Sequence, residues 1–152
     1  MPKMITSILA VGGILALFVI FCAAISAREA VTHPGAVNVP HLISAIAAVE
    51  NTPVGTGPCG EISRYQITKG VWDAHSDLEW TDENGQTDEA DRVAIAHVHW
   101  IRARLMRLGL QDTPHDIALV WKAGYGHCLA KRIRPEDRAY ARRVANVYED
   151  SK

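Results

Sequence analysis

The stretch VPHLISAIAAVE, residues 39–50, has the pattern of a short helix that packs one face against a core. Its larger apolar residues recur at the three- and four-residue spacing of an α-helix. They are Val39, Leu42, Ile43, Ile46 and Val49. Glu50 falls four residues after Ile46 and seven after Ile43, so the helical period brings its carboxyl group to the same apolar face.

An acid on an apolar helix face can be a functional group. Burial disfavours the charged form of a carboxylate, and the negative end of the helix dipole acts in the same direction. Glu50 is therefore a candidate proton donor near neutral pH. The alternative interpretation is a glutamate at a frayed helix end, with its side chain turned to water.

The first residues of the chain predict export. Residues 5–27 contain no charged side chain, Lys3 precedes them, and Arg28 and Glu29 follow. This layout is typical of a membrane anchor or an export signal, and the run reaches the roughly 20 residues that span a bilayer. A retained transmembrane helix, a signal cleaved after Ser26 and a buried core helix all remain open at this point.

A basic residue on the inner side leaves the rest of the chain outside. We therefore expect a protein that is anchored in the cell membrane and faces the periplasm or cell exterior, or one that is secreted. Residues 1–27 are the predicted anchor or signal peptide, and residues 28–38 are a linker with turn chemistry. Residues 39–150 form the one expected domain.

Composition gives little reason to expect a nucleic-acid partner, because 16 basic and 17 acidic residues leave a net charge of −1. A local basic stretch occurs late in the chain. It consists of Arg132, Arg134, Arg138, Arg142 and Arg143. We interpret it as the solvated face of a helix, with contact to an anionic polymer as the alternative.

Cys59 and Cys128 are the only cysteines outside the apolar segment, and two are enough for one disulfide in an oxidising compartment. His97 and His99 are two apart in a helical pattern and point in different directions. We therefore expect no metal and no cofactor, with a zinc site built from His97, His127 and Cys128 as the open alternative.

Short elements are expected in the first half of the domain. Residues 52–60 are rich in proline and glycine and predict a loop, and a short helix follows Thr68. An acidic loop is expected at 77–85. No segment longer than 63–68 alternates as a strand would. The sequence thus predicts a mainly α domain with at most a very small β element.

Longer helices are expected in the second half. The longest begins at position 87 or 88 and continues to Leu108, with Gly109 as its stop. The next starts at Thr113 with a capping-box pattern and ends at Gly124. The last helix begins at Pro135.

Three motifs in the same order support a comparison. Glu50 is followed by Gly60, Ser63 and Gln66-Ile67, then by ALVWKAGYG at 118–126 and YARRVANVY at 140–148. This series resembles the lysozyme-like superfamily that contains soluble lytic transglycosylases and goose-type lysozymes. The resemblance covers residues 39–149 and implies a lysozyme-like helical fold. Asn51-Thr52, Ser63 and Lys122 depart from the usual family residues, which are Ser, Gly and Asn.

The resemblance implies cleavage of the β-1,4 bond between N-acetylmuramic acid and N-acetylglucosamine in peptidoglycan. Glu50 would protonate the glycosidic oxygen. In the lytic version the muramic 6-hydroxyl then closes on the anomeric carbon. A hydrolase would use a second carboxylate, for which Glu61, Asp73 and Asp77 are the candidates. We favour the single-acid mechanism, and a membrane-tethered module that binds glycan strands without cutting them is the alternative function.

Family positions suggest further substrate contacts. Gln66 has an amide suited to an N-acetyl group or a hydroxyl, and Tyr65 has a ring that can contact a sugar face. Ser63 matches a position close to the acid. Tyr125 falls where the family lines its cleft, and Tyr140 matches a tyrosine that reaches toward the acid.

Other residues are expected to support the cleft. We expect Trp72, Trp100 and Trp121 in the core. The resemblance also implies that the loops of Cys59 and Cys128 lie on opposite sides of one cleft. A bridge between them would stiffen its walls.

Overall fold

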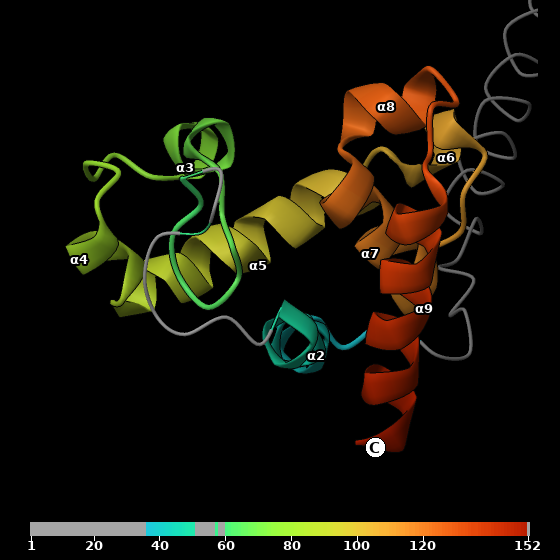
Figure 1. Cartoon of the computed structure of the whole chain (residues 1–152), viewed down its shortest axis with the longest axis horizontal. Coiled ribbons are helices and arrows are strands. Elements are labelled where there is room, and N and C mark those ends of the chain that lie inside the picture. Colours follow the sequence, from blue (N-terminus) through green and yellow to red (C-terminus); the bar gives the residue numbers. More distant parts are fainter. Residues whose placement is uncertain (1–35, 51–56, 58–59, 152) are drawn as a thin grey trace, which may run out of the picture. The chain divides into compact units, whose positions relative to one another are not determined.

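The computed structural model describes residues 36–50, 57 and 60–151. Figure 1 shows that this part of the chain is built from helices joined by loops, the longest of which precedes α3. The helices are α2 (Val39–Glu50), α3 (Lys69–His75), α4 (Asp82–Gly85), α5 (Asp88–Arg102), α6 (Leu105–Leu108), α7 (Pro114–Ala123), α8 (Tyr125–Leu129) and α9 (Pro135–Asp150). The predicted mainly α class is confirmed.

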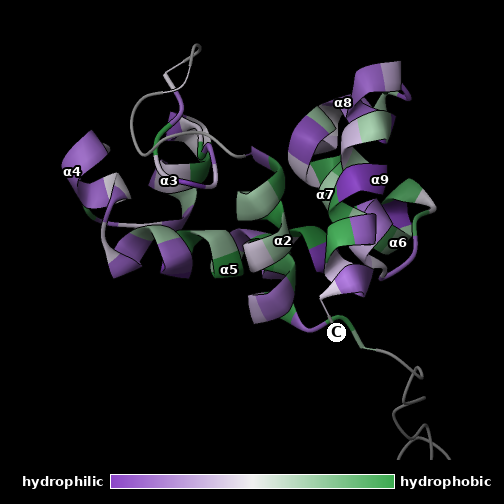
Figure 2. Cartoon of the chain, turned by 60° about the horizontal axis from the view of Figure 1, so that its bottom comes forward, coloured by the Kyte–Doolittle hydropathy of each residue, from purple (hydrophilic) through white to green (hydrophobic). Residues whose placement is uncertain are grey.

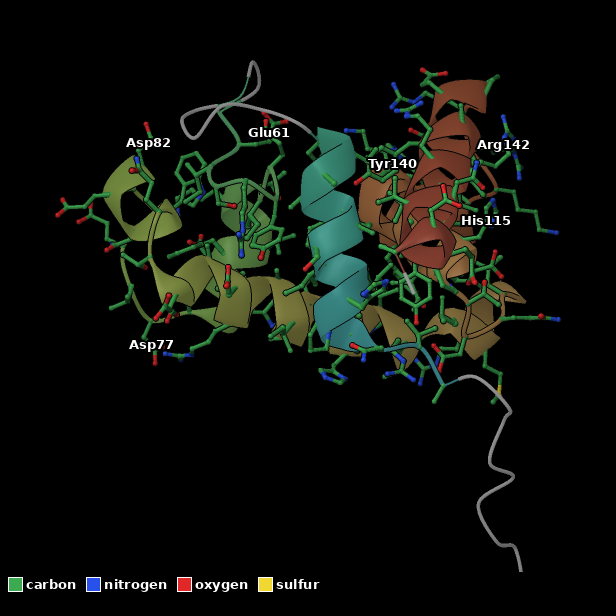
Figure 3. The ribbon with its side chains drawn as sticks, turned by 90° about the horizontal axis from the view of Figure 1, so that it is seen from below. Glu61, Asp77, Asp82, His115, Tyr140 and Arg142 are labelled. Atoms are coloured by element: carbon green, nitrogen blue, oxygen red, sulfur yellow. The ribbon has the colours of Figure 1, made fainter. Side chains whose placement is uncertain are left out.

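Helix α2 has the predicted bounds, and its apolar face is buried. Leu42 and Ile46 have no exposed surface, and the side chain of Asn38 accepts a hydrogen bond from the backbone of His41 at the start of the helix. The helix packs against α5 and α9, and Figure 3 shows it crossing α5, with α9 at its side. At its carboxyl end, Glu50 contacts Lys122 of α7.

Helices α7 and α9 form the most extensive helix pair in the described residues. Thr113 accepts a hydrogen bond from the backbone N–H of Asp116, which is the predicted cap of α7. Ile117 to Val120 are all buried, as expected from their nearly continuous apolar pattern.

In Figure 2, α4 is coloured hydrophilic, whereas α2 is mostly hydrophobic.

The predicted helix from 87 or 88 to Leu108 is interrupted. α5 ends at Arg102, and the backbone N–H of Arg104 turns to the carbonyl of Ile101. The guanidinium of Arg104 covers the ring of Trp100 at 3.9 Å and donates to the Trp100 carbonyl, which holds this break. A short α6 follows and stops at Gly109 in the left-handed conformation, as predicted.

Two short helices and one β-bridge are the remaining secondary structure of the described residues. α4 lies within the predicted acidic loop and α8 follows directly after Gly124, and neither was expected. The β element is one antiparallel bridge between Ile62 and Ile67. Within the described residues no helix is long and apolar enough to cross a membrane. The predicted anchor at 5–27 lies outside those residues.

Candidate active site

The carboxyl group of Glu50 is buried at the end of α2. Its side chain is only 9% exposed, and Oε1 lies 3.4 Å from Nζ of Lys122 on α7. The alternative of a glutamate turned to water does not hold. The sequence places these two residues far apart, and no pattern in it indicated their contact.

Tyr140 on α9 lies beside this pair. Its side chain is buried, and Nζ of Lys122 lies 4.9 Å from its ring centroid. Burial and the nearby Glu50 carboxylate both raise the pKa of Tyr140. The Tyr140 hydroxyl lies within hydrogen-bonding reach of the Glu50 carboxylate, although among the described residues it has no hydrogen bond of regular geometry. Figure 3 shows Tyr140 on the side of α9 that faces α2. The structure thus brings Tyr140 close to the acid, as the resemblance implied.

A cleft of about 270 Å³ adjoins the pair. It is lined by Gln66, Ile67, Thr68, Val71, His97, Trp100, Val120, Trp121, Lys122, Ala123, Gly124 and Tyr125. Two predicted contact residues, Gln66 and Tyr125, meet here although they are distant in the sequence. Lys122 belongs both to the lining and to the contact with Glu50, so it connects the cleft to the buried acid.

Aromatic side chains form one wall of the cleft. Tyr125 meets Trp100 edge-on with ring centroids 5.5 Å apart, and His97 stacks on Trp100 at 5.4 Å and meets Trp121 at 5.3 Å. Trp100 and Trp121 are half-buried residues that pack against the core, as expected, and also line the cleft. Trp72 has no exposed surface and does belong there.

The wall contains a neutral histidine. Burial, with a smaller effect from the charge of His75, lowers the pKa of His97 to about 4. Its Nδ1 lies 3.2 Å from Nε2 of His75. His97 therefore contributes an uncharged ring to the cleft at neutral pH.

The turn before Ile67 fixes the amide of Gln66. Ser63 and Gln66 both have positive φ angles, of 69° and 51°. Gln66 donates from Nε2 to the Ser63 carbonyl at 3.1 Å. A Cβ atom on Gly57 would lie 2.1 Å from Oε1 of Gln66. A side chain at position 57 would therefore require the ends of the Gln66 and Glu61 side chains to move.

Two predicted substrate contacts, Tyr65 and Ser63, are buried and therefore not available to a substrate. Tyr65 has no exposed surface, and its hydroxyl donates to Asp91 at 2.9 Å and accepts from Arg64 at 2.7 Å. Burial and the bond to Asp91 raise the pKa of Tyr65 to about 12. Ser63 is also buried, and its Oγ accepts from the backbone N–H of Tyr65. Tyr65 is thus a core residue and Ser63 stabilises the turn.

The three candidates for a second carboxylate do not line the cleft. Asp73 is exposed and pairs with Lys69 at 2.6 Å, and Asp77 is exposed. Glu61 is half-buried near Gly57. Residues 51–59, most of which the structure does not describe, contain no acidic residue. Glu50 is not part of the lining either, and it reaches the cleft through its contact with the lining residue Lys122.

Cys128 is a buried free thiol whose pKa is raised by burial. The predicted disulfide gains no support from it, and Cys59 lies outside the described residues. Among the residues that the structure describes, no three His, Cys, Asp or Glu side chains are grouped to hold a metal ion. His97 lies against His75, and the described residues contain no metal-binding group made of His97, His127 and Cys128.

Comparison with known proteins adds no assignment. The chain matches no protein-family model, no curated protein and no solved structure.

Proposed function

We propose that the protein cleaves the β-1,4 bond between N-acetylmuramic acid and N-acetylglucosamine in peptidoglycan, with Glu50 as the single general acid and base. The observation that carries the proposal is the buried Glu50 carboxyl group in contact with a lining residue of an aromatic cleft. The resemblance to the lysozyme-like superfamily supplies the substrate class. Export through residues 5–27 would bring the domain to the cell wall.

The cleft suits an amino-sugar chain. Aromatic rings such as those of Trp100 and Tyr125 can contact the apolar faces of sugar rings. The amide of Gln66 can bind an N-acetyl group or a hydroxyl. A volume of about 270 Å³ would hold only part of a glycan strand, so the remaining sugars would extend beyond the cleft.

In the proposed reaction Glu50 donates its proton to the glycosidic oxygen as the bond to the anomeric carbon breaks. The muramic 6-hydroxyl then attacks the anomeric carbon, and Glu50 takes the proton of that hydroxyl. The products are a 1,6-anhydro muramic end and a new 4-hydroxyl end. An inverting hydrolase needs a second carboxylate about 6.5 to 9.5 Å from the acid. The described lining contains no acidic residue, Glu50 included, so the preference for the lytic route rests on the resemblance.

A binding module that holds glycan without cutting it is the second candidate. The contact between Lys122 and Glu50 favours it, because Lys122 engages the carboxyl group that the lytic reaction would need as its proton donor. Incubation of the purified full chain with peptidoglycan separates the two functions. Release of muropeptides with anhydro ends, detected by mass spectrometry, supports the lytic enzyme. Binding to sacculi without release would support the module.

A further inference from the structure

Lys122 is the residue of the site that the proposed chemistry leaves unexplained. Its side chain is 41% exposed and lines the cleft, while its ammonium reaches inward to a buried carboxylate. The residue therefore has access both to Glu50 and to any molecule in the cleft. We propose that Lys122 binds a carboxylate group of the glycan, so that the cleft selects carboxylate-bearing sugars. This inference rests on the proposed function and specifies its substrate.

The contact between Lys122 and Glu50 leaves the ammonium available. The 3.4 Å distance is longer than the roughly 2.7 to 2.9 Å of a strong charge-assisted hydrogen bond. An ammonium has three donors, and within the described residues Glu50 is its one hydrogen-bond partner. A second anion can therefore be bound without first breaking a tight ion pair.

Lys122 is also the only cation among the described residues that line the cleft. Arg104 is engaged with the ring and carbonyl of Trp100. Arg143 approaches the ring of Tyr140, 5.8 Å from its centroid, and is not part of the lining. A carboxylate that enters the cleft would accordingly find its one fixed positive partner at Lys122.

The chemistry of the glycan offers two sources of such a carboxylate. N-acetylmuramic acid carries a lactyl carboxyl group, whereas N-acetylglucosamine carries no charge. The lactyl group is a free carboxylate where the stem peptide has been removed, and it is an amide where the peptide remains. In the second case the peptide supplies its own carboxylates.

The test measures binding and not turnover. The ligand is the disaccharide N-acetylglucosaminyl-N-acetylmuramic acid, which lacks the bond proposed to be cut. It is compared with its lactyl methyl ester and with its dipeptide conjugate by calorimetry on the full chain. We expect the free acid to bind at least about tenfold more tightly than the ester, and the preference to shrink as salt is added.

Variants assign the preference to Lys122. Lys122→Met should bind acid and ester equally, whereas Lys122→Arg should retain a preference for the acid. Lys131→Met is a matched control, because Lys131 is exposed and outside the lining. Thermal melts of each variant check folding. A dipeptide conjugate that binds like the free acid identifies the peptide as a second carboxylate source, and one that binds like the ester restricts the site to the lactyl group.

The proposal is overturned if the wild-type chain binds acid and ester equally, if it binds neither, or if Lys122→Met keeps the preference. Failure of the proposed function has a different signature. A chain that prefers the acid but releases no sugar from peptidoglycan would be a selective binder without lytic activity.

Discussion

The ammonium of Lys122 lies 3.4 Å from the carboxylate of Glu50 and connects α7 to the end of α2. The acid is nearly enclosed, whereas the lysine is open to the cleft. Removal of Glu50 from a buried pair would leave a lysine that can turn to water, whereas removal of Lys122 leaves a buried acid. This asymmetry means that the two residues can be tested separately.

Tyr140→Phe should not destabilise the domain. The hydroxyl is buried, and its interaction with Glu50 falls short of a regular hydrogen bond in the described residues, so its removal costs at most a weak interaction. We expect the free energy of unfolding to change by less than about 1 kcal/mol. Urea denaturation measures it, and a loss above about 1 kcal/mol would show that the hydroxyl has a strong partner.

His97 should make stability depend on pH. Its pKa is lowered from 6.5 to about 4 in the folded chain. The unfolded chain therefore binds more protons in this range, so stability falls as the pH is lowered from 6.5 toward 4. The shift corresponds to at most about 3 kcal/mol. Urea titrations at pH 7, 5.5 and 4.5 should show a weaker decline for His97→Asn.

The exposed His99→Asn variant is the control for that experiment. It should follow the wild-type pH dependence. An equal decline of the free energy of unfolding with falling pH in the wild type and in His97→Asn would mean that His97 does not cause the pH dependence.

Trp100 and Trp72 should respond differently to truncation. Trp72 is fully buried, and its indole N–H donates to the Leu78 carbonyl at 2.7 Å. Trp72→Ala should lower the free energy of unfolding by about 3 to 5 kcal/mol. Trp100→Ala should cost less stability but weaken glycan binding several-fold, because the ring lines the cleft. Melting curves measure the change in stability, and binding to purified glycan strands measures the change in affinity. Unaltered binding by Trp100→Ala would show that the aromatic wall does not contact the glycan.

Helices with a clear apolar period or a capping residue in their own sequence could be predicted. The apolar period of α2 and the cap at Thr113 are local features, and the structure has both. The break after Arg102 depends on Arg104 covering Trp100, which no periodicity shows. Helix α8 follows a glycine that was expected only to end α7.

The site was predictable only in part for the same reason. Glu50, Gln66 and Tyr125 belong to recognisable motifs, and the last two line the cleft. Periodicity assigns a residue to an apolar face but does not distinguish the core from a cleft. Tyr65 was therefore expected in the cleft although it is buried, and the cleft-lining face of Trp100 was missed although the residue also packs against the core. The approach of Lys122 to Glu50 spans 72 positions and requires the tertiary fold.

The central claim is that Glu50 is the proton donor, and release of sugar from purified peptidoglycan by the wild type and Glu50→Gln tests it most directly. Glutamine retains the shape but cannot donate the proton, so we expect release to fall by at least about a hundredfold, with binding to sacculi and the melting temperature maintained. Equal release by the two proteins would contradict the claim.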